Sequence, residues 1–160
     1  MKRHQIMFFL AVAAALVLAS AGCKTMGMAG TTKGQLLKIN IEAPTDLPDL
    51  GADNVDVILG NRGVNNIQDV LVDVELPPEL SVLGQTNDRG IDVVHDSSSN
   101  VYHFTIGKLQ PAEDSHLRFR VQTHFGRSVE VPINVTAWQK DLPGEKLFRK
   151  TVIRLRERSF

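Results

Sequence analysis

Four histidines in the second half of the chain have side chains that could ligate a metal ion. They are His95, His103, His116 and His124. A hairpin around residues 96–100 would place His95 and His103 within reach of one ion. Zinc sites need three or four convergent ligands at tight spacings, and the sequence offers no such cluster. The alternative is that these histidines lie on the polar faces of strands, and we expect neither a bound metal nor a cofactor.

Two other groups of polar residues have the types, but not the spacing, of a metal or catalytic site. Four aspartates lie within residues 46–56, but they fit no calcium-binding loop, and a solvated turn accounts for them. The Asp-Ser-His run at residues 114–116 contains the residue types of a catalytic triad. Consecutive strand residues point to opposite faces, so these three side chains cannot converge. We therefore expect a protein that is not an enzyme.

The C-terminal segment carries the strongest candidate binding surface. Four of its basic residues share one parity: Lys150, Arg154, Arg156 and Arg158. In a strand they would share a face with Phe148 and Val152. That face could dock on anionic lipid headgroups, polysaccharide or an acidic partner. Alternatively, it is a charged outer face that keeps a terminal strand from aggregating.

An N-terminal leader precedes the elements that would position these residues. Lys2 and Arg3 form a basic start, residues 6–18 form an uncharged apolar run, and small residues at 19–22 precede Cys23, the only cysteine. These three features together are typical of a secretory signal peptide. The apolar run is shorter than the roughly 20 residues that span a bilayer. Residues 1–22 are therefore predicted to be a signal peptide.

The junction at residues 20–23, Ser-Ala-Gly-Cys, resembles the lipobox of bacterial lipoproteins. This resemblance implies that the Cys23 sulfur receives a diacylglycerol, that the leader is cut just before it, and that acyl chains hold the protein to a membrane. The family usually has leucine where Ser20 stands. Residues 19–21, Ala-Ser-Ala, also fit ordinary signal cleavage, which would release a soluble protein beginning at Gly22.

Cleavage before Cys23 would leave 138 of the 160 residues, enough for one domain that buries a core without disulfides. Loss of Lys2 and Arg3 from 18 basic residues leaves 16 against 18 acidic ones, which does not suggest nucleic-acid binding. Residues 23–34 are expected to form the lipidated N-terminus and a flexible linker. Lys24 stands where an aspartate often retains lipoproteins at the inner membrane, so the resemblance favours the outer membrane, facing the periplasm or the cell surface.

Residues 35–157 consist of short runs of alternating apolar and polar residues separated by turns. Val70–Leu76, Leu117–Val121 and Val129–Ala137 are the clearest of these runs. Alternation of this kind is typical of half-buried strands. It predicts an all-β domain with seven to nine strands, arranged as a sandwich of two sheets.

Pro132 lies inside one of these runs and predicts a bulge or an unpaired edge there, because proline cannot donate to a sheet ladder. A bulge would change the face that Trp138, the only tryptophan, joins. Trp138 is a candidate anchor for a partner if it is exposed. The alternative is that it covers the end of the sandwich.

A series of motifs resembles the bacterial immunoglobulin-like "conserved repeat" domain of envelope and surface proteins. The matching segments are Asn61-x-Gly63, Val70–Pro77, Tyr102–Ile106, Leu109–Glu113 and Leu117–Val121. Ala112 stands where that family usually has glycine. The resemblance implies an immunoglobulin-like sandwich with a surface role and without catalytic residues.

Together these features predict a lipid-anchored envelope protein whose domain binds or braces another envelope protein. The partners implied are the membrane, through Cys23, and a second protein, with no nucleic acid. The alternative function is a ligand-binding lipoprotein that holds a metal ion or an anionic glycan.

Overall fold

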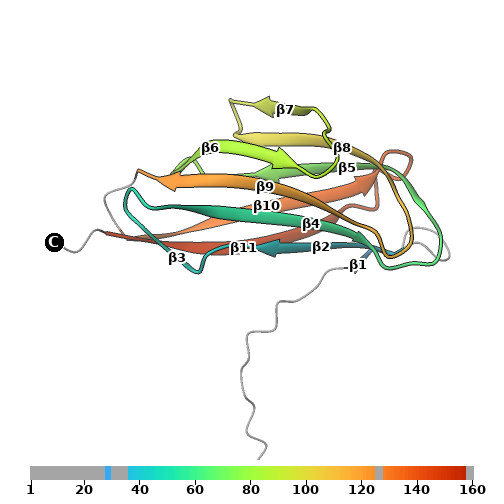
Figure 1. Ribbon diagram of the computed structural model, residues 1–160, viewed down its shortest axis with the longest axis horizontal. Coiled ribbons are helices and arrows are strands. Elements are labelled where there is room, and N and C mark those ends of the chain that lie inside the picture. Colours follow the sequence, from blue (N-terminus) through green and yellow to red (C-terminus); the bar gives the residue numbers. More distant parts are fainter. Residues whose placement is uncertain (1–27, 30–35, 125–127, 158–160) are drawn as a thin grey trace, which may run out of the picture.

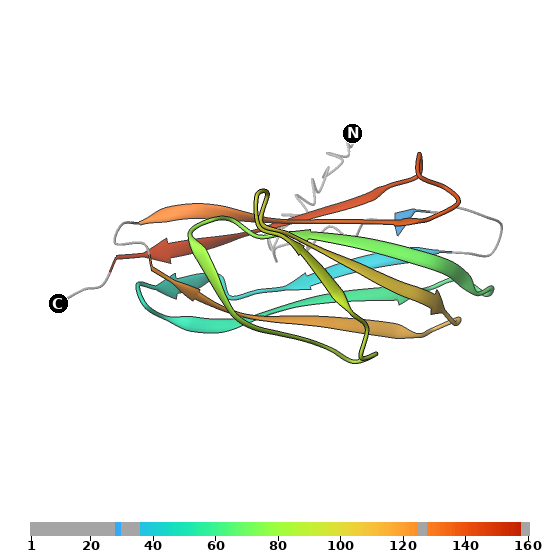
Figure 2. The same ribbon diagram turned by 90° about the horizontal axis from the view of Figure 1, so that it is seen from above.

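The computed structural model describes residues 28–29, 36–124 and 128–157 of the chain, and these form two layered β-sheets (Figures 1 and 2). The first sheet has the strand order β1 (Met28–Ala29), β2 (Leu37–Glu42), β4 (Ala52–Asn61), β9 (Asp114–Thr123) and β6 (Leu80–Asn87). The second has the order β3 (Asp46–Pro48), β11 (Leu147–Arg156), β10 (Val129–Gln139), β5 (Ile67–Glu75), β8 (Val101–Leu109) and β7 (Val93–Asp96). Neighbouring strands are antiparallel except β3 and β11, which are parallel.

The alternation of apolar residues determines which side chains fill the space between the sheets. In β9, Leu117, Phe119 and Val121 are fully buried, while the residues between them are exposed. Phe104 of the second sheet meets Phe119 of the first edge-on, with ring centroids 5.9 Å apart. Such aromatic pairs add to the hydrophobic stabilisation of the core. The predicted all-β sandwich is confirmed, and no helix that could cross a membrane is found in the described ranges.

Two very short strands extend the sheets beyond the number that alternation predicts. β1 pairs with Leu37 and Lys38 of β2, and it lies within the segment predicted to be a linker. β3 lies in the proline-containing loop before β4 and pairs with the end of β11. Strands of two or three residues are too short to show a period-two pattern, so the sequence does not reveal them.

The Asn-x-Gly turn and the loop at residues 109–113 are joined by the buried side chain of Asn61. Its Nδ2 donates to the carbonyls of Asn65 (2.7 Å) and Leu109 (3.0 Å), and its Oδ1 accepts from the Gly63 amide (2.9 Å). The amide of Ala112 donates to the Asn61 carbonyl at 2.8 Å. Two motifs that are far apart in the sequence are therefore parts of one hydrogen-bonded corner.

Pro132 causes no bulge, because β10 pairs with β11 in continuous register from Val129 to Ala137. It lies instead on an unpaired edge, since pairing of β10 with β5 begins only at Asn134, opposite Glu75. Of the two predicted alternatives, the edge is correct. Trp138 consequently keeps the parity of Pro132 and lies on the outer face of the second sheet.

Candidate functional site

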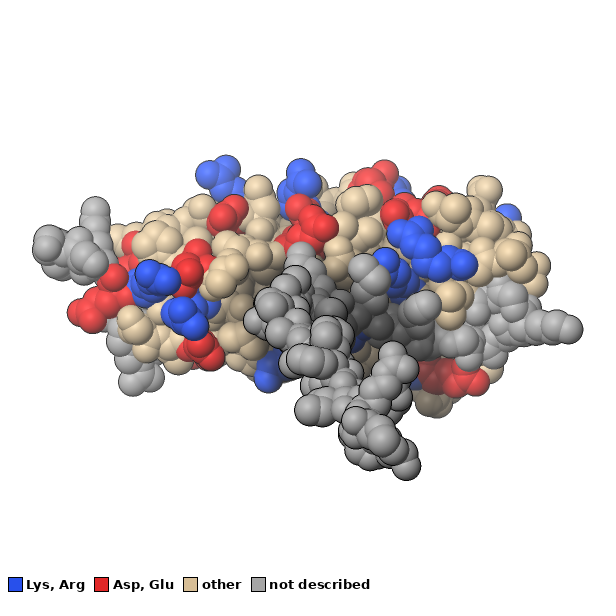
Figure 3. Space-filling model, turned by 90° about the horizontal axis from the view of Figure 1, so that it is seen from below, with Lys and Arg blue, Asp and Glu red and all other residues tan. Residues whose placement is uncertain are grey.

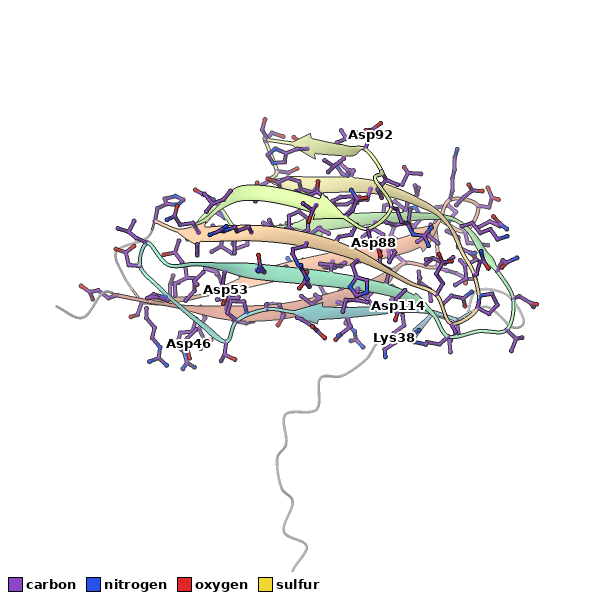
Figure 4. The ribbon with its side chains drawn as sticks, viewed as in Figure 1. Lys38, Asp46, Asp53, Asp88, Asp92 and Asp114 are labelled. Carbon is purple, nitrogen blue, oxygen red and sulfur yellow. The ribbon has the colours of Figure 1, made fainter. Side chains whose placement is uncertain are left out.

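The predicted basic face on β11 exists, but acidic neighbours neutralise much of it. Arg156 Nε lies 2.8 Å from Asp46 Oδ1, and Arg154 Nη2 lies 3.1 Å from Glu130 Oε1. Figure 4 shows Asp46 beside the end of β11, and Figure 3 shows acidic and basic side chains interspersed on the underside. Lys150 is exposed on the same face. This arrangement matches the charged outer face better than a continuous positive surface.

Phe148 and Val152 are the apolar members of this face, with exposed fractions of 54% and 44%. Two predicted site residues, Cys23 and Arg158, lie outside the described residues. The patch is therefore only partly described, and the ion pairs of its described arginines are surface pairs worth about 0.2–1 kcal/mol each.

Trp138 neither stands free of the surface nor covers the end of the sandwich. It is half-buried in a shallow hollow of about 340 Å³ on the outer face of β10, next to Leu71 of β5. The Lys146 Nζ atom lies 4.4 Å from the centre of its ring, a cation–π contact that covers part of the indole. His103 lines the same hollow and its Nδ1 lies 2.6 Å from Asp73 Oδ1.

His95 and His103 do not face each other as the hairpin suggested. In the β7–β8 register His95 is opposite Tyr102, and Val94 is opposite His103, so the two histidines point to opposite sides of the hairpin. His95 stacks on Tyr102 with ring centroids 4.1 Å apart. The described residues contain no group of three or more His, Cys, Asp or Glu side chains placed to hold a metal ion.

The Asp-Ser-His run at 114–116 is also held in separate structural contacts. Asp114 forms an ion pair with Arg62 at 2.7 Å. Asp88, which directly follows β6 and is labelled in Figure 4, accepts hydrogen bonds from the Ser115 hydroxyl (3.1 Å) and the His116 amide (3.0 Å). These three neighbours do not converge, as strand geometry predicts.

A groove of about 850 Å³ lies where β10 extends past the end of β5. One wall is the first half of β10, from Val129 to Asn134. The other walls are the connection from Glu75 to Val82 and the β7–β8 hairpin tip. Buried apolar side chains form its floor, among them Leu76, Pro77 and Tyr102.

The backbone of β10 faces this groove with an unequal set of hydrogen-bonding groups. In β11, the Arg154 amide donates to the Thr45 carbonyl, and the Arg156 carbonyl accepts from the Asp49 amide. The backbone N–H and C=O groups of the even-numbered residues of β11 therefore point away from β10. Odd-numbered residues of β10 therefore bond to β11, and its even-numbered residues point the other way. Glu130 and Pro132 thus direct their backbone groups into the groove. They supply two carbonyls but one N–H, because proline has none.

The hairpin tip is held in shape by Asp96. Its carboxylate accepts hydrogen bonds from the hydroxyls of Ser98 and Ser99, each at 2.7 Å, and from the Ser98 amide at 2.9 Å. These hydrogen bonds lower the pKa of Asp96 to about 2, and the bond from the Ser99 hydroxyl has the largest effect. Asn100 then links the tip to the opposite wall, because its Nδ2 donates to the Leu76 carbonyl at 2.9 Å.

Three carboxylates line the groove, and no Lys or Arg does so among the residues described there. Glu75 accepts from Asn134 Nδ2 at 3.0 Å, and Glu130 is paired with Arg154. Glu79 is half-buried and has no hydrogen-bond or ion-pair partner within the described part of the chain. The groove is therefore acidic and rich in acceptors.

Sequence reasoning missed this groove. The available signals were Pro77-Pro78 with glutamates on either side, and a proline inside a strand pattern at 132. These prolines indicate where β5 ends and where β10 lacks a partner, but not that the two positions lie side by side in the folded protein.

Several solved structures share the fold at low sequence identity. The CARDB domain of the PF1109 protein from Pyrococcus furiosus, in complex with di-metal ions, has a TM-score of 0.54 and 15% identity, with coverage of 81% of this chain and 100% of that chain. A cohesin module of a Clostridium perfringens family 33 glycoside hydrolase has a TM-score of 0.53, 12% identity, and coverage of 79% and 100%. AvmM, which catalyses macrocyclization in alchivemycin A biosynthesis, has a TM-score of 0.51, 12% identity, and coverage of 81% and 92%.

These similarities confirm an immunoglobulin-like β-sandwich and, at such identities, show the fold alone. No protein-family model matches the chain, and no curated protein matches it. The resemblance to the "conserved repeat" domain remains a prediction.

Proposed function

We propose that this protein is a lipid-anchored, non-catalytic binding module of the bacterial cell envelope. Cys23 would carry the acyl chains, and the sandwich would bind another envelope protein. The observation that carries the proposal is the junction at residues 20–23, where the only cysteine directly follows a signal-peptide pattern. Lys24, in place of an aspartate, supports the outer membrane as the location.

Binding is favoured over catalysis by what the reactive side chains contact. Ser115 and His116 are both held by Asp88, while Asp114 is paired with Arg62. The fold itself does not decide the matter, because the similar structures include the enzyme AvmM as well as a CARDB domain and a cohesin module. The groove beside β10 offers a recessed surface with unpaired backbone groups, which suits recognition of another chain.

The alternative roles in binding a metal ion or an anionic glycan have less support. His95 and His103 point to opposite sides of their hairpin, so they cannot share an ion. The arginines that would hold an anionic glycan already contact Asp46 and Glu130.

Mass spectrometry of the N-terminal peptide tests the anchor. The protein purified from detergent-solubilised envelopes should begin at Cys23 and carry fatty acids, and Cys23→Ser should move it to the soluble fraction. A soluble wild-type protein beginning at Gly22 without acyl groups would contradict the proposal.

Affinity capture tests the binding role. A tagged full-length protein should retain a defined envelope protein that a version with residues 35–157 deleted does not. Identical captured proteins from the two would show that the sandwich is not the binding part.

A further inference from the structure

We infer that the groove beside β10 binds an extended segment of a partner protein that carries Lys or Arg side chains. This inference rests on the proposed binding function and names the site and the chemistry of the partner. It depends on three properties of the groove: its charge, its backbone groups and its floor.

The charge of the groove favours a cationic occupant. Glu75, Glu79 and Glu130 contribute three carboxylates, and within the described ranges only Glu130 has an ion-pair partner. Glu79 is half-buried with no partner among the described residues, so a cation beside it would replace lost hydration with a charge-assisted hydrogen bond. An anionic segment would instead be repelled.

The backbone of the groove favours a donor-rich occupant in an extended conformation. Among the described residues, the carbonyls of Glu130 and Pro132 and the N–H of Glu130 have no strand partner where β5 has ended. An incoming strand can donate to these carbonyls, as in β-strand addition, but continuous pairing stops at Pro132. The edge therefore accepts a short segment and does not propagate a longer sheet.

The floor suits the aliphatic part of a basic side chain. Leu76, Pro77 and Tyr102 are buried and line the same groove as the carboxylates. Lys and Arg place their methylene stems on apolar surface and keep the charged head near polar groups. A volume of about 850 Å³ is enough for a few residues and too small for a folded domain.

The walls of the groove are already in place without a partner. Asp96 fixes the hairpin tip through Ser98 and Ser99, and Asn100 ties the tip to Leu76. A preorganised site loses less conformational entropy on binding.

Selection from a random peptide library tests this inference. The mature chain with Cys23→Ser would be used to select ten-residue peptides displayed on phage. We expect enrichment of peptides that contain Lys or Arg. A labelled consensus peptide should then bind more weakly as salt is raised.

Variants identify the site. Glu79→Gln should weaken binding of that labelled peptide about two- to fivefold, and Glu75→Gln with Glu79→Gln about tenfold, as expected for loss of partly exposed charges. Glu145→Gln is the matched control, because Glu145 is exposed in the β10–β11 turn and does not line the groove. It should leave affinity unchanged.

The inference would be overturned if selection yields no peptides, yields neutral or acidic ones, or yields basic ones that bind Glu79→Gln as tightly as the wild type. The inference would also be overturned if the selected peptides were not enriched in Lys or Arg and a neutral oligosaccharide displaced them from the groove. If Cys23 is acylated and a partner is captured in these cases, the proposed function survives and only the assignment of the groove fails.

Discussion

Ala112 adopts a backbone conformation that alanine rarely takes. Its φ is 61°, in the left-handed region, at the position where the resembling family usually has glycine. Its amide donates to Asn61, so the conformation is required to close the corner between the Asn-x-Gly turn and the loop at 109–113. The cost of holding a Cβ in this region is about 1–2 kcal/mol.

Replacing Ala112 with glycine should therefore stabilise the protein. We expect Ala112→Gly to raise the free energy of unfolding by about 1 kcal/mol, because relief of strain exceeds the added entropy of the unfolded chain. Urea denaturation measures this. Ala52→Gly is the control, since Ala52 is an exposed strand residue, and it should lower stability by about 0.5–1 kcal/mol. A loss of stability in Ala112→Gly would refute the explanation.

Asp96 should titrate near pH 2. Hydrogen bonds from Ser99 and Ser98 lower its pKa from 3.8 to about 2, so the folded protein binds a proton there less readily than the unfolded chain. Its stabilising effect is present above pH 3.8 and is lost as the pH falls towards 2. NMR titration of the carboxyl carbon would measure this pKa.

Ser99→Ala should move the Asp96 pKa towards its ordinary value, because it removes the largest cause of the shift. Ser97→Ala is a suitable control, since the Asp96 contacts run to Ser98 and Ser99. An unchanged titration in Ser99→Ala would show that the tip is held in another way.

The first half of β10 has an edge that no neighbouring strand of the described chain covers. Its first five residues pair with β11 on one side and, in the part of the chain that the structure describes, with no strand on the other. Because Pro132 has no N–H to donate on that open side, a second chain cannot pair continuously along the edge. Proline at such positions is a known protection against edge-to-edge aggregation.

Pro132→Val should therefore promote self-association. The substitution restores an N–H on the open side and adds a residue that favours strands. Sedimentation velocity at increasing protein concentration should show dimers or larger species. Thr136→Val makes a similar apolar change where β5 already pairs, opposite Asp73, and should remain as monomeric as the wild type. Equal self-association of Pro132→Val and Thr136→Val would show that Pro132 does not protect this edge.

Local patterns predicted the strands well because period-two alternation depends on neighbouring residues only. Val70–Leu76 and Leu117–Val121 show this clearly, as does the hairpin around residues 96–100. The same patterns could not show that His95 and His103 point apart, because that depends on the register of β7 against β8. The groove was missed for the same reason: it forms where β5 ends and β10 continues, a relation between residues nearly 60 positions apart.

A single core must hold both sheets together without an intramolecular disulfide, since Cys23 is the only cysteine. Phe119 is central to that core and contacts Tyr102 and Phe104 across the space between the sheets. Domains of this size have a total stability of about 5–15 kcal/mol, so one large cavity can remove much of it.

Phe119→Ala should lower the free energy of unfolding by about 3–5 kcal/mol through lost burial and the cavity left behind. Thermal and urea unfolding of the purified mature chain would measure this. Val64→Ala, at a side chain that is 79% exposed, should change stability by less than about 0.5 kcal/mol. A small effect of Phe119→Ala would mean that the two sheets are held together elsewhere.

If Cys23 is acylated as proposed, the pairing of β1 with β2 would limit the distance between the domain and the membrane. Met28 follows that cysteine by five residues, a reach of at most ~18 Å even when fully extended. Such a short linker would keep the β1–β2 edge of the first sheet close to the lipid headgroups. β7 lies at the far end of the other sheet's strand order and on the opposite side of the molecule in Figure 1. The β7–β8 hairpin would then lie on the side of the domain that faces away from the bilayer.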